Sequence, residues 1–158
     1  MNSDRIEQIL EKVKSATSLK DFAKDLLWAI AKEFDASQGA FFITNKNDDG
    51  IHIIQFLAGY AYHLPESETI EFEFGEGLSG QVAKEGKLIN IQTVPDGYIQ
   101  ILSGLGQSSP NTIIIFPLKT GDKVKAVIEL ASFKLFSKED EDFLSELAAK
   151  AATFFDKF

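Results

Sequence analysis

Glycines near the middle of the chain form the first pattern that could do chemistry. Gly75-x-Gly77-x-x-Gly80 has the spacing of the fingerprint that binds a dinucleotide. The helix expected after it covers only residues 77–85 before Gly86, which is too short to return the chain along a parallel strand. The pattern therefore predicts a tight strand-to-helix turn, in which the glycines let two backbone segments pack closely.

Catalytic and metal-binding patterns are missing from the sequence. The run Gly77-Leu78-Ser79-Gly80-Gln81 lacks the last glycine of a nucleophile elbow. His52 and His63 fall on a strand and in a loop, and local spacing gives them no further metal ligands. The absence of cysteine excludes thiolate chemistry and disulfides. We therefore expect no enzyme activity, no metal and no cofactor.

Glu129 is the most informative charged residue. It interrupts an apolar run, and on a strand it shares a face with Val127 and Ala131. Ile128 and Leu130 point to the opposite face. A carboxylate among small apolar neighbours is costly unless it is paired or reaches water. The run therefore predicts that Glu129 either lines a cavity or stands at an edge.

Hydrophobic periodicity predicts the elements that must position these residues. Helices are expected over 4–15, 19–35 and 77–85, and from Ser137 to the end, and strands over 39–45, 51–61, 69–74, 88–94, 112–119 and 123–133. Several strand connections are too short for a crossover, so the sheet should be mainly antiparallel, in an α+β fold. The terminal helices should cover one sheet face. The short helix and a long loop over 98–111 remain for the other face.

Composition limits the class of protein. A length of 158 residues fits one domain, and a net charge of −8 argues against a nucleic-acid partner. No apolar run approaches about 18 residues, so no membrane-spanning helix is expected. The first residues do not resemble a secretory signal, which predicts a cytoplasmic protein.

The stretch from Phe74 to Ala148 resembles a GAF domain, a small-molecule sensor and dimerisation module of signalling proteins. The resemblance is carried by FGEGLSGQVAKEGKLINI (74–91), VPDGYIQILSGLG (94–106), TIIIFPLKTGDKVKAVIELASF (112–133) and FSKEDEDFLSELA (136–148). It implies one domain over 1–158, with an N-terminal helix over 1–16. A C-terminal helix over 137–158 would lead to an output domain, such as that of a histidine kinase.

The family fold is a six-stranded antiparallel sheet with terminal helices on one face and a ligand cavity on the other. The short helix and the 98–111 loop, expected to be a mobile lid, would roof this cavity. A ligand site should reach about 300 Å³. The residues expected to line it, on the face away from the terminal helices, are Phe41, Tyr60, Leu78, Val82, Tyr98, Ile101, Leu102, Phe116 and Glu129.

Departures from the family pattern narrow the function. The methionine-sulfoxide reductases of the family work through cysteines, and bilin-binding members attach their pigment to one, but this chain has none. Phe136, Asp140 and Glu141 match only half of the cyclic-nucleotide motif. The resemblance therefore implies a non-catalytic sensory module for an unknown small molecule, whose terminal helices pass on the ligand state. The alternatives are a dimerisation module with a collapsed cavity and, less favoured, an enzyme.

The helices also predict a homodimer. Trp28 falls on the charged side of the second helix, opposite its apolar stripe, and the final helix carries more apolar positions than one sheet face needs. A two-fold helix bundle would bury this surplus. The residues expected in the interface are Trp28, Ile6, Ile9, Leu10, Phe154 and Phe158.

Overall fold

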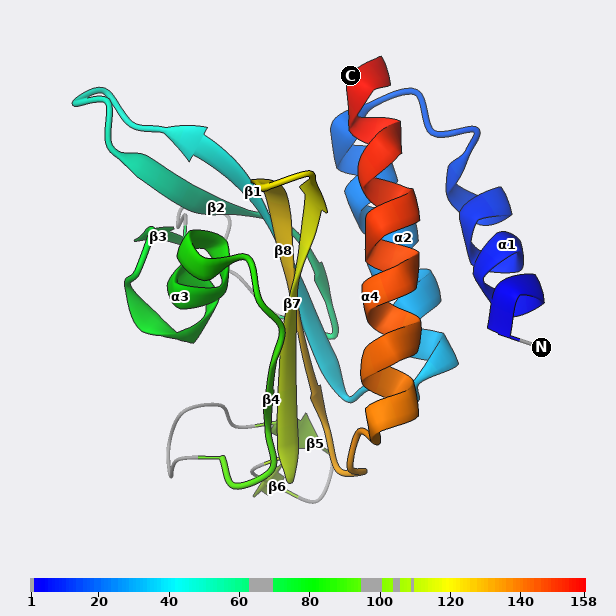
Figure 1. Cartoon of the computed structure of the whole chain (residues 1–158). Coiled ribbons are helices and arrows are strands. Elements are labelled where there is room, and N and C mark those ends of the chain that lie inside the picture. Colours follow the sequence, from blue (N-terminus) through cyan, green and yellow to red (C-terminus); the bar gives the residue numbers. More distant parts are fainter. Residues whose placement is uncertain (1, 63–69, 95–100, 104–105, 109) are drawn as a thin grey trace.

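The computed structural model describes residues 2–62, 70–94, 101–103, 106–108 and 110–158. The described helices are α1 (Asn2–Val13), α2 (Leu19–Glu33), α3 (Gly77–Glu85) and α4 (Lys138–Ala152), which runs into the 3₁₀ helix η1 (Thr153–Lys157). The described strands are β1 (Gln38–Lys46), β2 (His52–Tyr60), β3 (Glu71–Glu73), β4 (Ile89–Ile91), β5 (Ile101–Ser103), β6 (Gly106–Ser108), β7 (Thr112–Thr120) and β8 (Lys123–Ser132). Figure 1 shows the helices α2 and α4 on one side of the sheet and α3 on the other.

The main sheet has six strands in the order β3-β2-β1-β8-β7-β4, and every neighbouring pair is antiparallel. The predicted α+β class and six-stranded antiparallel sheet are therefore confirmed. The long loop expected over 98–111 is wrong in part, because β5 and β6 pair within it as a second, two-stranded sheet. Short connections explain the pairs β1–β2, β5–β6 and β7–β8, since they permit only antiparallel return of the chain.

Strand β8 lies at the centre of the sheet and has apolar neighbours on both faces. Ile128 and Leu130 are fully buried in the cluster beneath α2 and α4. Val127 and Ala131 belong to a separate cluster that packs against α3. We call the two sides of the sheet the helix face and the outer face. This alternation is the one that the sequence predicts for a strand.

Helix α1 forms a third layer rather than covering the sheet. It packs against α2 and α4, on their side away from the strands (Figure 1). Arg5 forms an ion pair with Glu33 of α2, and its guanidinium carbon lies 4.6 Å from the centre of the Phe143 ring of α4. The expectation that both terminal helices lie on the sheet is therefore correct for α4 and wrong for α1.

This third layer occupies much of the surface that the sequence assigns to a partner chain. Ile6, Ile9 and Leu10 are at most 7% exposed within the single chain. The rings of Phe154 and Phe158 lie 6.0 and 5.6 Å from the ring of Phe22. The surplus apolar stripe of α4 is thus partly covered by the chain's own α1 and α2.

Trp28 is covered by a strand and not by a helix. Its ring lies edge-on to Tyr60 of β2 at 5.3 Å, and its Nε1 donates a hydrogen bond to the Gly59 carbonyl at 3.1 Å. The ammonium groups of Lys24 and Lys32 lie 5.6 and 5.7 Å from the ring centre. Trp28 is still 38% exposed in the single chain, and its burial by a helix of a partner chain stays a prediction.

The glycine pattern before α3 is the predicted tight turn. Gly75 and Gly77 have φ angles of 92° and 66°, and residues with a side chain rarely adopt such values. A Cβ atom added to Gly80 would lie 2.5 Å from the Glu73 carbonyl oxygen, so the first turn of α3 contacts the end of β3 backbone to backbone. The glycines therefore set the approach of α3 to the sheet.

Replacing Gly80 by alanine should lower the free energy of unfolding by about 1 kcal/mol. Overpacking against backbone costs about 1–3 kcal/mol. The helix propensity that alanine gains over glycine offsets only about 0.5–1 kcal/mol of this. Urea denaturation of the Gly80→Ala variant tests the prediction. Gln81→Ala, at the next and exposed position of α3, is the control and should change stability by less than about 0.5 kcal/mol. Equal stabilities of the two variants would contradict the close approach.

Candidate functional site

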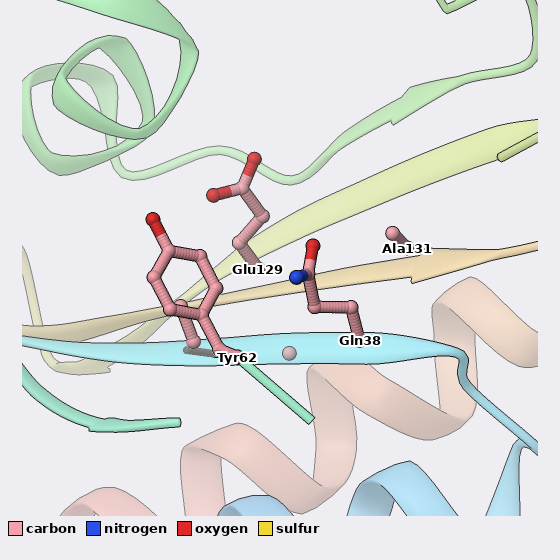
Figure 2. A pocket seen from close by; sticks show the side chains of 6 residues that line it. Gln38, Tyr62, Glu129 and Ala131 are labelled. Carbon is pink, nitrogen blue, oxygen red and sulfur yellow. The ribbon is translucent and has the colours of Figure 1, made fainter. Parts of the chain in front are cut away.

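The register of three strands places Glu129 on the outer face. Glu129 of β8 lies opposite Ala40 of β1 and Ile115 of β7. Both of these neighbours belong to the apolar cluster of the outer face. The prediction that Glu129 faces away from the helix layer is therefore confirmed. Its carboxylate points toward the side on which α3 lies (Figure 2).

A small hollow lies beside this carboxylate. It is lined by Gln38, Gly39, Ala40, Tyr62, Glu129 and Ala131, and its volume is about 10 Å³. Figure 2 shows Gln38, Tyr62 and Glu129 rising from the same side of the sheet. A volume of this size is at the lower limit for one water molecule. The cavity of ligand size expected from the sequence is therefore not present at Glu129 among the described residues.

Apolar side chains fill the space that a larger cavity would need. The rings of Phe56 and Phe72 lie 6.1 and 5.9 Å from the ring of Phe42, at interplanar angles of 82° and 62°. The Tyr62 ring lies 5.2 Å from that of Phe56. Val82 of α3 is fully buried in the same cluster. The outer face is thus closed by aromatic packing on one side of the hollow and by α3 on the other.

Two hydroxyl groups accompany the Glu129 carboxylate. The hydroxyl of Ser79, a buried residue in the first turn of α3, donates to Glu129 Oε2 at 3.5 Å, which is long for a hydrogen bond. Burial raises the pKa of the Tyr62 phenol, and the negative charge of Glu129 raises it further. Both causes disfavour the phenolate. The hollow therefore combines a carboxylate with protonated hydroxyls inside an apolar surround.

Local backbone conformation brings Tyr62 over the hollow. Ala61 has a φ angle of 51°, a left-handed conformation that turns the chain back directly after β2. A Cβ atom at Gly59 would lie 2.9 Å from the Tyr62 Cβ atom. The absence of a side chain at Gly59 therefore lets Tyr62 fold down onto the outer face.

Three of the predicted cavity residues lie on the wrong face. Phe41 and Phe116 each pair with Ile128, and directly opposite residues of antiparallel strands share a face. Both are fully buried under the helices. Tyr60 pairs with Gly39 after a bulge in β2 and packs on the helix side with Trp28. The bulge shifts the alternation by one residue, which a strand pattern does not reveal.

Of the remaining predicted cavity residues, some lie on the expected side of the sheet and the others have side chains that the structure does not describe. Leu78 and Val82 lie on α3 and pack against the outer-face cluster, on the expected side, although neither lines the hollow. Ile101 and Leu102 belong to β5, whose side chains the structure does not describe. Tyr98 lies outside the described residues. A role in ligand binding stays a prediction for all of them.

Sequence reasoning missed several residues of the hollow. Gln38 and Ala40 pair with Ala131 and Glu129, so the β1–β8 register would have placed them there. Ser79 lies in the glycine-rich turn, and the glycine spacing does not indicate that its hydroxyl reaches Glu129. Tyr62 had no signal in the sequence, because its place depends on the left-handed conformation of Ala61.

Metal and membrane sites receive no support from the described part of the chain. It contains no group of three or more histidine, aspartate or glutamate side chains that could hold a metal ion. None of its helices combines the length and the apolar character that a membrane crossing requires.

The sequence identifies the family. A family model for the GAF domain matches residues 16–156, which is most of the chain. The chain therefore belongs to the GAF domain family. A comparison with curated proteins finds no match.

Solved structures of this fold superpose along nearly the whole chain. The GAF domain of an Acinetobacter phosphoenolpyruvate-protein phosphotransferase has a TM-score of 0.78 at 19% identity, over 99% of this chain and 93% of that one. A GAF domain of A. aeolicus in an inactive state has a TM-score of 0.73 at 20% identity, covering 98% and 95%. The free methionine-R-sulfoxide reductase of Neisseria meningitidis, in complex with its substrate, has a TM-score of 0.75 at 19% identity, covering 99% and 89%. At these identities the similarity shows the fold alone.

The raised pKa of Tyr62 predicts a loss of stability in alkaline solution. Above the ordinary phenol pKa of 10.0, the unfolded chain releases this proton before the folded chain does. The free energy of unfolding should therefore fall as the pH rises above about 10, and Tyr62→Phe should remove part of this fall. Glu129→Gln should remove only part of the upward shift in the pKa of Tyr62, because burial is the larger cause of that shift.

Denaturation across the alkaline range, together with ultraviolet titration of the phenols, measures both effects. Tyr60→Phe is the matched control, because Tyr60 lies on the helix face. The same pH dependence in Tyr62→Phe as in the wild type would contradict this placement of Tyr62.

Proposed function

We propose that this chain is a non-catalytic, small-molecule-sensing GAF module of a signal-transduction protein. The observation that carries the proposal is the position of Glu129, a carboxylate on a sheet face that is otherwise apolar or small. Carboxylate oxygens accept hydrogen bonds, so this position offers a polar group to a bound molecule. The Ser79 hydroxyl at 3.5 Å and the Tyr62 phenol add further polar groups to the same place.

The ligand enters when the Tyr62 ring moves away. The floor of the hollow consists of Ala40, Ala131 and the backbone of Gly39, which leave room once the ring is displaced. Tyr62 is only half-buried, and it follows a turn rather than a strand. A closed site of this kind opens at the cost of the ring's contacts with Phe56. The hollow of about 10 Å³ then represents the closed form.

The chemistry of the hollow selects the ligand class. A carboxylate accepts hydrogen bonds and favours positive charge, so the ligand presents an ammonium, amide or hydroxyl group to Glu129. The raised pKa of Tyr62 keeps its phenol protonated, so it can donate to an acceptor on the same ligand. A small polar molecule with a donor and an acceptor side by side suits both groups.

The C-terminal helix is in position to receive the ligand state. Strand β8 ends three residues after Glu129, and α4 begins a short connection later. Asn90 of β4 donates from Nδ2 to the Phe136 carbonyl and to Glu141 Oε2, both at 3.0 Å. These bonds tie the far edge of the sheet to the start of α4. A change in the tilt of β8 would therefore move α4, and through it an output domain such as a histidine kinase.

An enzyme is the less supported alternative. Some structural neighbours are methionine sulfoxide reductases, but this chain has no cysteine with which to carry out thiol chemistry. The cytoplasmic location expected from the sequence stays a prediction.

A dimerisation module without a ligand is the other alternative. The aromatic filling of the outer face supports it. The residues proposed for the interface support it less, because Ile6, Ile9 and Leu10 are already buried by the chain itself. The large apolar side chains still exposed near the helices include Trp28, Leu135 and Phe158, which are 38%, 62% and 40% exposed. A homodimer would use these.

Native mass spectrometry of freshly purified protein separates the alternatives. We expect the wild-type chain, as monomer or dimer, to carry the additional mass of a small polar molecule. Glu129→Gln should lower the affinity for it about tenfold or more, since hydrogen bonds to a charged group contribute about 1.5–3 kcal/mol. Glu139→Gln makes the same change at an exposed position of α4 and should leave the bound mass unchanged.

Two results would contradict the proposal. One is a wild-type dimer with no additional mass, together with a panel of small polar metabolites of which none raises the melting temperature. That combination would favour the dimerisation module. The other is a bound molecule that Glu129→Gln and Glu139→Gln retain equally, which would place the ligand elsewhere.

A further inference from the structure

A second and larger hollow lies on the same side of the sheet as α3. It opens where the β1–β2 turn, the β7–β8 turn and the end of α3 come together, and its volume is about 390 Å³. Figure 1 shows both turns at the upper end of the sheet, with α3 below them. The volume falls within the range of small-molecule sites, about 300–1,000 Å³. No residue lines both this hollow and the one at Glu129.

Positive charge gathers around this second hollow. Its lining includes Lys46 at the end of β1, Lys84 in the last turn of α3 and Lys123 at the start of β8. Asp122 is the one carboxylate of the lining, so these four side chains sum to a net charge of +2. The whole chain carries −8. The lining of the hollow is therefore positively charged, although the protein as a whole is negatively charged.

The three ammonium groups are available to a ligand. The ion pairs between described residues use Arg5, Lys14, Lys134, Lys138 and Lys150, and none of them uses a lysine of the hollow. The side chain of Lys84 lies along the turn before α3, with its Cδ 3.3 Å from the place of a Gly75 Cβ. Because Gly75 has no side chain, the aliphatic part of Lys84 can pass close to it.

Part of the remaining wall is apolar, beside the polar residues Thr44 and Asn45. The His52 imidazole and the Phe74 ring are tilted by 38° with their centres 5.3 Å apart, and both line the hollow. Ala83 and Val124 complete this part of the wall. An aromatic pair of this kind offers a surface on which a planar group can stack. A bare inorganic ion would leave this surface unused.

We propose that this hollow is a binding site for a small organic anion with at least two negative charges and a planar or apolar portion. The lysines hold the charged group, whether phosphate or carboxylate, and the His52–Phe74 wall holds the carbon skeleton. The site is separate from Glu129, and this inference does not depend on the function proposed above. Helix α3 borders both hollows, with Ser79 toward Glu129 and Lys84 toward the second one.

Titration of the full ¹⁵N-labelled chain, followed by nuclear magnetic resonance, tests the site. The probes are phenyl phosphate and phthalate, which distinguish the two anionic groups, with inorganic phosphate for comparison. We expect saturable shifts, for at least one aromatic dianion, centred on the amides around His52, Lys84 and Lys123. Inorganic phosphate should bind more weakly. Added salt should weaken all binding, because these lysines are exposed.

Charge variants give the decisive comparison. Lys84→Gln combined with Lys123→Gln should weaken binding about twenty-five-fold, since each exposed ion pair is worth about a factor of five. Lys12→Gln combined with Lys20→Gln removes the same charge from exposed positions of α1 and α2. This control should leave the affinity within about twofold, because α1 and α2 lie on the opposite side of the sheet from the hollow. All of the substituted side chains are exposed, so both variants should keep the wild-type spectrum.

Three results would overturn the inference. The absence of localised shifts with every probe would show that there is no site. An equal loss of affinity in the two double variants would show only a general effect of charge. Inorganic phosphate that binds as tightly as phenyl phosphate would show that the aromatic wall has no part in recognition.

Discussion

The pairing of β8 with β1 on one side and β7 on the other is the constraint on which the rest of the structure depends. Because β8 is central, both of its faces must be covered, and its side chains alternate between the two apolar clusters. Helices α2 and α4 close one face, and α3 with the aromatic cluster closes the other. A single register then fixes where Glu129 points and which residues of β1 and β7 share its face.

Much of this arrangement follows from local sequence. Alternation within the β8 run predicted the face of Glu129 correctly. Ser18 and Ser137 start α2 and α4 by accepting hydrogen bonds from the backbone of Asp21 and Asp140. The bounds of α3 are also as predicted, because Gly86 ends the helix in a left-handed conformation. Each of these features depends on residues that are close together in the chain.

The errors come from features that depend on distant residues. Phe41 and Phe116 alternate as expected within their strands, but only pairing with Ile128 decides the face. Tyr60 and Tyr62 are placed by a bulge in β2 and by the left-handed Ala61, and neither has a sequence signature. The stripe of α1 predicts burial, but not whether α4 of the same chain or of a partner provides the cover. The structure assigns that role to the same chain.

We propose that the polar groups at Glu129 serve a ligand rather than the fold. A crystal structure of the protein, purified from cells without any step that removes small molecules, tests this claim most directly. We predict electron density for a small non-protein molecule beside the Glu129 carboxylate, with the Tyr62 ring displaced from Ala40. A hollow that still measures about 10 Å³, holds at most one water molecule and keeps Tyr62 in place would contradict the account.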